Sequence, residues 1–256
     1  MTEHAAGTPS WVDLSTTDAD GSVAFYGALF GWTATEGSED FGGYRTFLDD
    51  GQSVAGLNPM GEFPAWSTYV ATDDADATTE KVTANGGTVI APPMDVGALG
   101  RMAIFQDPAG AMFGVWQPGE HRGAEKVNAP YSLCWNELHA RGFEGVKPFY
   151  GAVFGWDPQP FGEPADGQPA YFVWNLGDRG IGGGMEMMEG APAEVPSHWL
   201  TWFAVVNRDD TVAKAQELGG SILMTDMNMP GVGKMAVVQD PQGASFGVLE
   251  AETADE

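Results

Sequence analysis

Two acidic residues in similar surroundings are the first candidates for chemistry in this sequence. Asp13 lies two residues after Trp11 in "WVDLSTTD", and Glu137 lies two residues after Trp135 in "WNELHARG". A carboxylate that is buried beside an indole loses water, which raises its pKa and suits it to general acid or base catalysis. If instead the assignment of strand faces is off by one residue, both acids are ordinary exposed side chains.

The histidines and the cysteine carry weaker signals. His139 follows Glu137 by two residues and could assist it, but neither His139 nor His198 has an evident partner in the sequence, so surface or structural roles compete with a catalytic one. Cys134 has no histidine at a spacing that would activate its thiol, so we expect a small buried side chain. As the single cysteine, it cannot form an intramolecular disulfide.

The charge balance excludes several classes of partner. The chain has 36 acidic and 11 basic residues, for a net charge of −25. Such a surface is typical of high solubility, or of a field that steers cationic ligands, and it repels nucleic acids and anionic membranes. No apolar run approaches the roughly 20 residues that span a bilayer, and the start of the chain lacks the basic and apolar regions of a signal peptide. We therefore expect a cytoplasmic protein.

Internal repeats show that the chain is a duplication. "FYGALFGW" at 25–32 recurs as "FYGAVFGW" at 149–156, and "FQDPAGAMFGVW" at 105–116 recurs as "VQDPQGASFGVL" at 238–249. A polar segment with Pro and Gly separates the copies and is predicted to be a linker. The predicted organisation is an N-terminal tail (1–8), a first domain (9–117), the linker (118–130), a second domain (131–250) and an acidic tail (251–256).

Each copy is itself doubled. In the first half of the first copy, the two-residue period predicts a strand with Trp11, Asp13 and Ser15 on one face and Val12 and Leu14 on the other. A helix follows, with Asp18 or Asp20 as its N-cap and Gly31 at its C-cap. The remaining predicted elements are strands at 44–49 and 52–57, then a second set with a strand at 66–72, a helix over 74–87, and strands at 88–93, 101–107 and 111–116.

The paired strand-helix-strand-strand-strand units, with "FYxxxFGW" on the first helix and "DPxG" before the last strand, resemble the vicinal oxygen chelate superfamily. This family groups glyoxalases, bleomycin-resistance proteins and ring-cleaving extradiol dioxygenases. The resemblance covers about residues 9–117 and 131–250. It implies an α+β fold of two tandem domains, each built from two β-α-β-β-β modules that form an incomplete barrel around a cavity.

Metal-dependent members of that family carry a His on the first strand, a His or its equivalent on the fifth and a Glu on the last, and these side chains are ordinary ligands for Zn, Ni, Mn or Fe. The matching positions here are Trp11 and Trp135, Ser67 and Leu200, and Gly114 and Gly247, with a further position near Gly56 and among residues 182–184. The indole of Trp, the isobutyl group of Leu and a glycine cannot coordinate a dication, and a lone serine would not hold one. We therefore predict no metal and no cofactor, and the loss of metal-based enediolate or oxygen chemistry.

If the fold is that of the family, the faces that would surround the metal line a small-molecule cavity instead. The glycines leave room where a ligand side chain would stand, and aromatic and methionine side chains suit a flat, conjugated molecule. Alternatively, the two first-strand tryptophans are core residues that plug a dead site. The predicted ligand-binding residues are Trp11, Trp135, Ser67, Tyr69, Leu200, Trp202, Met112, Gly114, Trp116 and Gly247.

Two functions of different classes fit this reading. The first is a metal-free protein that binds a hydrophobic aromatic small molecule, for drug sequestration, as the bleomycin-resistance branch implies, or for metabolite handling. The second is a cofactor-independent isomerase, lyase or hydrolase of specialised metabolism, with Asp13 or Glu137 as general base and His139 or Tyr69 assisting. A metal-dependent glyoxalase or dioxygenase would need ligands that the sequence does not supply.

The sequence leaves the pairing of the modules open. Each copy can close its own cavity, or the first half of one copy can pair with the second half of the other. Because the duplication supplies within one chain what a smaller relative obtains by dimerising, we expect a monomer.

Overall fold

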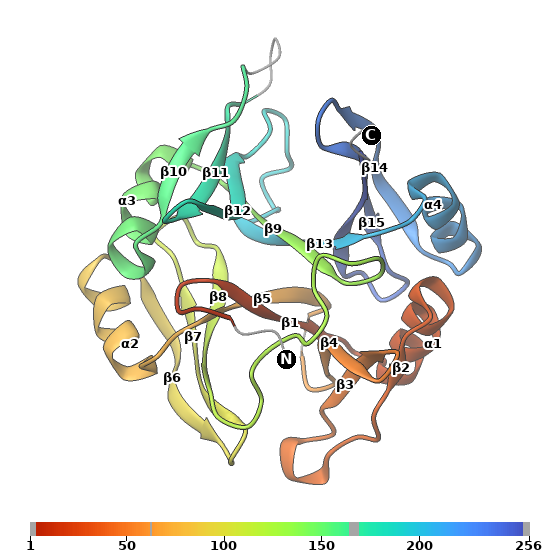
Figure 1. The fold of residues 1–256 in the computed structure, drawn as a ribbon, viewed down its shortest axis with the longest axis horizontal. Helices are drawn as coiled ribbons and strands as arrows, with labels where there is room; N and C mark the ends of the chain where they lie inside the picture. The colour runs from red at the N-terminus through yellow and green to blue at the C-terminus, as the bar shows by residue number, and fades with distance from the viewer. Residues whose placement is uncertain (1–3, 62, 164–168, 253–256) are drawn as a thin grey trace. The chain divides into compact units, whose positions relative to one another are not determined.

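The computed structural model describes residues 4–61, 63–163 and 169–252, and Figure 1 labels most of its helices and strands. The first three residues of the predicted N-terminal tail and most of the predicted acidic tail lie outside these ranges. In both repeats, the elements follow the predicted order of strand, helix and further strands.

The first repeat contains the predicted elements within a few residues, together with a two-residue strand and a short 3-10 turn that the pattern did not show. Its elements are β1 (Pro9–Ser15), α1 (Ala19–Phe30), β2 (Thr33–Ala34), η1 (Glu39–Phe41), β3 (Arg45–Asp49), β4 (Gln52–Asn58), β5 (Ala65–Ala71), α2 (Ala75–Ala84), β6 (Thr88–Val96), β7 (Gly100–Gln106) and β8 (Met112–Pro118).

The second repeat has the same order of elements. They are β9 (Leu133–Ala140), α3 (Phe143–Phe154), β10 (Asp157–Pro160), β11 (Tyr171–Leu176), β12 (Arg179–Glu186), β13 (His198–Ala204), α4 (Arg208–Glu217), β14 (Ser221–Met229), β15 (Gly233–Gln239) and β16 (Ser245–Ala251). None of the helices in the described residues combines the length and apolar character needed to cross a membrane.

Within the described residues, each repeat supplies the strands of one eight-stranded mixed sheet. The strand orders are β2-β3-β4-β1-β5-β8-β7-β6 and β10-β11-β12-β9-β13-β16-β15-β14, so both sheets are open at their ends. The pairs β1–β4 and β5–β8 are parallel, whereas β3–β4 and β7–β8 are antiparallel. The arrangement confirms the predicted α+β fold of β-α-β-β-β modules.

The first helix of each repeat begins in a different way. In α1, the Asp18 carboxylate accepts a hydrogen bond from the Gly21 amide at 2.9 Å, and Gly31 ends the helix with a φ of 80°. Gly31 was the predicted C-cap, and Asp18 is one of the two residues predicted as the N-cap. At the start of α3, the Glu186 carboxylate of β12 accepts from the amides of Gly142 and Phe143, each at 2.8 Å. A carboxylate at this end also meets the positive pole of the helix dipole.

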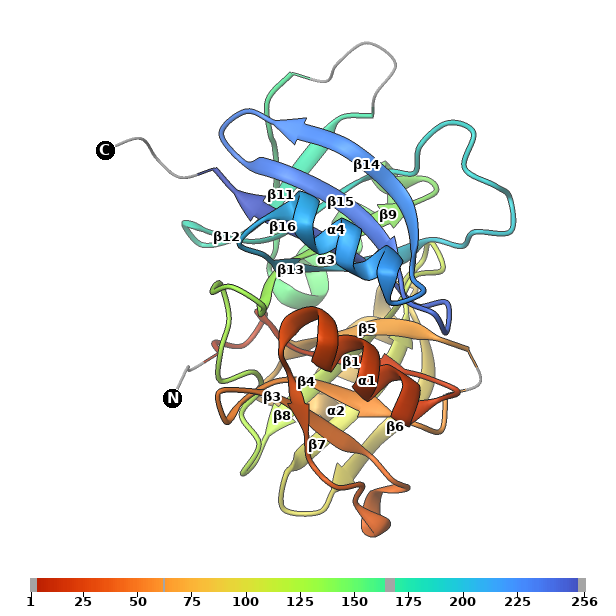
Figure 2. The ribbon, with the colours of Figure 1, turned by 90° about the vertical axis from the view of Figure 1, so that its right-hand side faces the viewer.

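Contacts divide the chain into two compact units that interleave the repeats. Within the described residues, unit 1 contains 4–11, 67–123 and 135–200, and unit 2 contains 12–66, 124–134 and 201–252. Helices α2 and α3 pack together in unit 1 (Figure 1), and α1 and α4 pack together in unit 2 (Figure 2). The structure therefore uses both pairings that the sequence left open: each sheet comes from one repeat, and each hydrophobic core joins modules of different repeats.

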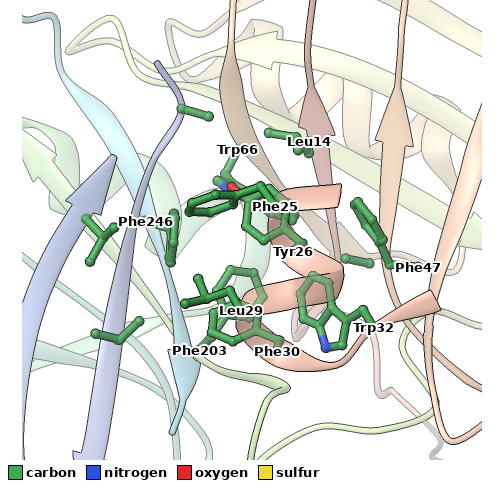
Figure 3. Packing of buried hydrophobic residues seen from close by; sticks show 14 of the residues in the cluster. Leu14, Phe25, Tyr26, Leu29, Phe30, Trp32, Phe47, Trp66, Phe203 and Phe246 are labelled. Carbon is green, nitrogen blue, oxygen red and sulfur yellow. The ribbon is translucent and has the colours of Figure 1, made fainter. Parts of the chain in front are cut away.

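The core of unit 2 surrounds Tyr26 of α1, whose side chain is fully buried. Figure 3 shows the aromatic rings around it, which come from both repeats. Tyr26 stacks on Trp32 with centroids 5.8 Å apart and meets Trp66 edge-on at 5.5 Å. Phe203 and Phe246 of the second repeat pack against Phe30. Pairs of this kind contribute about 0.5–1.5 kcal/mol each beyond their buried area.

A buried hydrogen-bond chain links the two repeated motifs. In unit 2, the Trp66 indole donates to the Tyr26 hydroxyl at 3.0 Å, and that hydroxyl donates to the Asp240 carboxylate at 3.0 Å. Unit 1 repeats the chain with Trp199 to Tyr150 at 3.0 Å and Tyr150 to Asp107 at 2.8 Å. In each unit the tyrosine of one copy's helix therefore binds the aspartate of the other copy's "DPxG" turn.

Candidate functional site

Strand β9 places Glu137 on one face and Leu138 on the other, as the two-residue period predicts. Leu138 lies fully buried in the core of unit 1. Glu137 is also buried, with 8% of its surface exposed. A buried carboxylate needs hydrogen-bond donors in place of water, and the neighbouring side chains supply them.

Glu137 binds His139 of the same strand. The Nε2 atom of His139 lies 2.5 Å from Oε1 of Glu137, and both side chains are largely shielded, with 14% and 11% exposed. Because a carboxylate only accepts, the Nε2–H of His139 is the donor. The predicted pair of acid and histidine is therefore formed, and its short, charge-assisted bond fixes the orientation of the imidazole.

Tyr171 of β11 is the second donor to Glu137. The Tyr171 hydroxyl also accepts a hydrogen bond from the Trp135 indole at 2.8 Å. Burial and the charge of Glu137 hold the pKa of Tyr171 well above its ordinary value, so the phenol stays protonated. The result is a chain from indole to phenol to carboxylate, with His139 hydrogen-bonded to the same carboxylate.

His198, the first residue of β13, completes the cluster. Its ring stacks on that of His139, with centroids 5.2 Å apart and planes inclined by 18°. Burial lowers the pKa of His198 below its ordinary value. The two histidines that lacked partners in the sequence are therefore partners of each other, because β9 and β13 are neighbours in the sheet. We call Trp135, Glu137, His139, Tyr171 and His198 the histidine cluster.

Unit 2 contains a simpler counterpart of this cluster. The Tyr44 hydroxyl donates to Oδ1 of Asp13 at 2.6 Å. Asp13 pairs in register with Gly56, and Glu137 pairs with Gly183. A Cβ atom at either glycine would lie 1.9 Å from the hydroxyl of Tyr44 or Tyr171, so each glycine makes room for a phenol. Each repeat thus pairs a carboxylate with a tyrosine.

The glycines of the last strands also make room for an aromatic ring. A Cβ atom at Gly114 would lie 2.3 Å from the Tyr69 ring, and one at Gly247 would lie 2.1 Å from the Trp202 ring. The sequence predicted that these glycines leave room for a small molecule. That expectation was wrong, because the rings of Tyr69 and Trp202 occupy the space beside them. Among the described residues, the Trp202 indole nitrogen is buried without a hydrogen-bond partner.

The remaining predicted ligand-binding residues lie in several environments. Trp11 is 4% exposed and meets His121 edge-on at 4.4 Å, while the Trp116 indole donates to the His121 carbonyl at 2.8 Å. Leu200 is buried and Ser67 is half-buried. Met112 is 42% exposed at the start of β8, so it does not face an enclosed space as predicted, because the strand only begins there.

The cysteine has the inert character that its surroundings predicted. Burial raises the pKa of the Cys134 thiol to about 12. The thiol donates to the Trp202 carbonyl at 3.4 Å.

The residues at the family's metal positions do not fit a metal ion. The first-strand positions carry indoles, and the glycines on the fourth and last strands are crowded by Tyr44, Tyr171, Tyr69 and Trp202. Among the residues that the structure describes, no group of three or more His, Cys, Asp or Glu side chains is placed to hold an ion. The chemistry available to the histidine cluster is therefore proton transfer through its imidazoles and carboxylate.

The sequence named Asp13, Glu137 and His139 as candidates but did not name Tyr44 or Tyr171, which hydrogen-bond to the two acids. Strand β3 pairs antiparallel with β4, and β11 with β12. Tyr44 lies two residues before Thr46, which pairs with Gly56. Tyr171 lies two residues before Val173, which pairs with Gly183. A signal was present, since Tyr44 directly precedes β3 and Tyr171 begins β11, the matching strand of the other repeat. It can be read only together with the register of the hairpins.

Comparisons with known proteins agree with this architecture. The sequence model described as Glyoxalase/Bleomycin resistance protein/Dioxygenase superfamily matches residues 8–115. The chain is similar to the anthracycline biosynthesis protein DnrV of Streptomyces peucetius, with 42% identity over an alignment of 268 residues that covers 98% of this chain and 95% of DnrV. It is also similar to CFP32 of Mycobacterium tuberculosis, provisionally named a glyoxylase, with 42% identity over 97% of this chain and 96% of CFP32.

A solved structure confirms the fold. The 2,3-dioxygenase LapB of Pseudomonas sp. KL28 superposes with a TM-score of 0.67 over 100% of this chain and 96% of its own, at 13% identity. At that identity, the likeness concerns the fold alone. With the sequence relatives and the module architecture, it leads to one assignment: the chain belongs to the vicinal oxygen chelate superfamily of glyoxalases, bleomycin-resistance proteins and dioxygenases.

Proposed function

We propose that this protein binds a hydrophobic aromatic small molecule without the family's metal and transfers a proton on it at the histidine cluster of the second repeat. The observation that carries the proposal is the Glu137 carboxylate, which accepts hydrogen bonds from both Tyr171 and His139. A buried carboxylate that orients an imidazole is a recurring arrangement for general acid and base catalysis.

The relatives support a role in small-molecule metabolism. DnrV is named an anthracycline biosynthesis protein, and its similarity extends over 98% of this chain. We infer a comparable place in specialised metabolism for this chain, with an isomerase or lyase step as the reaction type.

A second candidate is sequestration of an aromatic molecule without turnover. Tryptophans stand at both first-strand positions, where Trp11 is buried and Trp135 is half-buried. A ligand that stacks on the half-buried Trp135 ring gains binding energy without any need for a base. The two candidates differ in what happens to the ligand after it binds.

Binding is tested by titration with quinizarin, a flat polycyclic quinone, while tryptophan fluorescence and the thermal midpoint are recorded. We expect quenching and a rise in the midpoint, because a ligand at 100 times its Kd stabilises the folded state by about 2.7 kcal/mol. The Glu137→Gln variant keeps the shape of the site and should bind with similar affinity. Binding by neither protein, across a panel of polycyclic quinones and flat antibiotics, would contradict the proposal.

A further inference from the structure

The tautomer of His198 is fixed by a backbone carbonyl. Its Nδ1 atom lies 2.9 Å from the carbonyl oxygen of Pro196. Because a carbonyl can only accept a hydrogen bond, Nδ1 carries the hydrogen, and the neutral ring keeps its lone pair on Nε2. His198 is half-buried, so its side chain keeps part of its surface exposed.

The surroundings of His198 favour its neutral form. Burial is the main cause that lowers the pKa of His198, and a charge on the stacked His139 lowers it further. The Pro196 carbonyl and the Glu137 carboxylate act in the opposite direction but do not overcome burial. At neutral pH, His198 is therefore a base, while His139 is the imidazole that a carboxylate holds.

Arg141 anchors the segment that presents the Pro196 carbonyl. Its guanidinium donates to the carbonyls of Ala191, Pro192 and Val195 at 3.3, 2.8 and 3.3 Å. Its backbone amide donates to the Ser197 hydroxyl at 3.0 Å. Pro196 thus lies between two anchored residues, which keeps its carbonyl in place against Nδ1 of His198.

The first repeat lacks this arrangement. Ser15 lies two residues after Asp13, where His139 follows Glu137, and Ala65 precedes Trp66, where His198 precedes Trp199. The carboxylate and tyrosine occur in both repeats, but the two imidazoles occur only in the second. Proton transfer therefore belongs to the second repeat.

We propose that His198 is the base that removes a proton from the carbon next to the carbonyl of an uncharged aromatic ketone. This inference rests on the proposed function and names its base and substrate class. The proton passes from the α-carbon to Nε2 of His198, the C–H electron pair forms the carbon–carbon double bond of an enolate, and the carbonyl π pair moves onto oxygen. Return of a proton from Nε2 to a carbon of the enolate restores the ketone or completes an isomerisation, so atoms and charge balance.

The charges of the cluster select this substrate class. The polar groups that act on the two imidazoles are the Glu137 carboxylate and the Pro196 carbonyl, which present negative charge and oxygen lone pairs. The chain as a whole carries a net charge of −25. A carboxylate or phosphate substrate is repelled by both, whereas an uncharged ring system can stack on the half-buried Trp135 and Tyr171.

The proposal is tested with β-tetralone, an uncharged aromatic ketone with acidic α-protons, in deuterium oxide. Proton NMR follows the protein-catalysed exchange of those protons for deuterium. In His198→Asn, the side-chain amide takes the place of Nδ1–H against the Pro196 carbonyl but offers no base. We expect this variant to lose about 100-fold or more of the exchange rate, the usual effect of a general base. The matched control His4→Gln, outside the cluster, should exchange at the wild-type rate.

The outcomes separate this inference from the proposed function. If His198→Asn exchanges as fast as wild type while Glu137→Gln does not, another group takes the proton and His198 is the wrong base, although the proposed function stands. If the wild type binds quinizarin but does not exchange β-tetralone, the aromatic ketone is the wrong substrate class. If it binds no aromatic molecule, the proposed function fails as well.

Nitrogen-resolved NMR of the four histidines tests the same claim without a substrate. We expect His198 as the Nδ1–H tautomer, with a pKa below the ordinary value of about 6.5. An Nε2–H tautomer, or a pKa above that of a free histidine, would overturn the proposal.

Discussion

At the scale of single residues, glycine decides what the neighbouring strand can place against it. Gly247 admits the Trp202 ring, and Gly183 admits the Tyr171 hydroxyl. The sequence showed that these positions lack a metal ligand, and it located Glu137 and His139. It could not show that rings occupy the space or that His198 reaches His139, because both facts depend on pairing between strands that are distant in sequence.

Substitution of Gly247 tests whether the Trp202 ring fills the last-strand position. The Cβ atom of Gly247→Ala would lie 2.1 Å from that ring, and both groups are buried. Overpacking of this kind costs about 1–3 kcal/mol of the free energy of unfolding, which urea denaturation measures. In the control Gly145→Ala on α3, a Cβ atom meets nothing within 4 Å, so stability should be unchanged or higher. Equal stability of Gly247→Ala and wild type would show that the position is open.

At the scale of elements, the periodic segments were predictable and the short ones were not. The caps Asp18 and Gly31 and the alternation of strand faces are local signals, and they suffice to predict α1 and β1. Strands β2 and β10 are two and four residues long, and they form because β3 and β11 offer an edge to pair with. The N-terminus of α3 depends on Glu186, more than forty residues further along the chain, and no local signal marks it.

The repeated tyrosine of the first helix should matter more for stability than its size indicates. Tyr26→Phe removes the hydroxyl that links Trp66 to Asp240 and leaves both groups buried without that partner. We expect a loss of about 1–3 kcal/mol in the free energy of unfolding, measured by urea denaturation. Tyr131→Phe is the matched control, because the Tyr131 hydroxyl has no hydrogen-bond partner among the described residues; it should change stability by less than about 0.5 kcal/mol. Equal effects of the two substitutions would contradict a structural role for the hydrogen-bond chain.

At the scale of the whole molecule, the duplication makes the pairing of the modules ambiguous in the sequence. Both repeats carry the same helix tyrosine and the same turn aspartate, so the sequence alone allows Tyr26 to bind either Asp107 or Asp240. The structure selects Asp240 and builds each core from two repeats, while each sheet keeps the strands of one. The predicted monomer stays a prediction. The two repeats are alike in fold but differ in chemistry, since the imidazoles lie in the second.

The central claim is that this chain performs its function without the metal of its superfamily. Elemental analysis of protein purified without chelator, from cells supplied with Mn, Fe, Ni and Zn, tests it most directly. The account predicts far less than one equivalent of any of these metals per chain after gel filtration. One equivalent per repeat that survives gel filtration and is lost in Glu137→Gln or Asp13→Asn would contradict it.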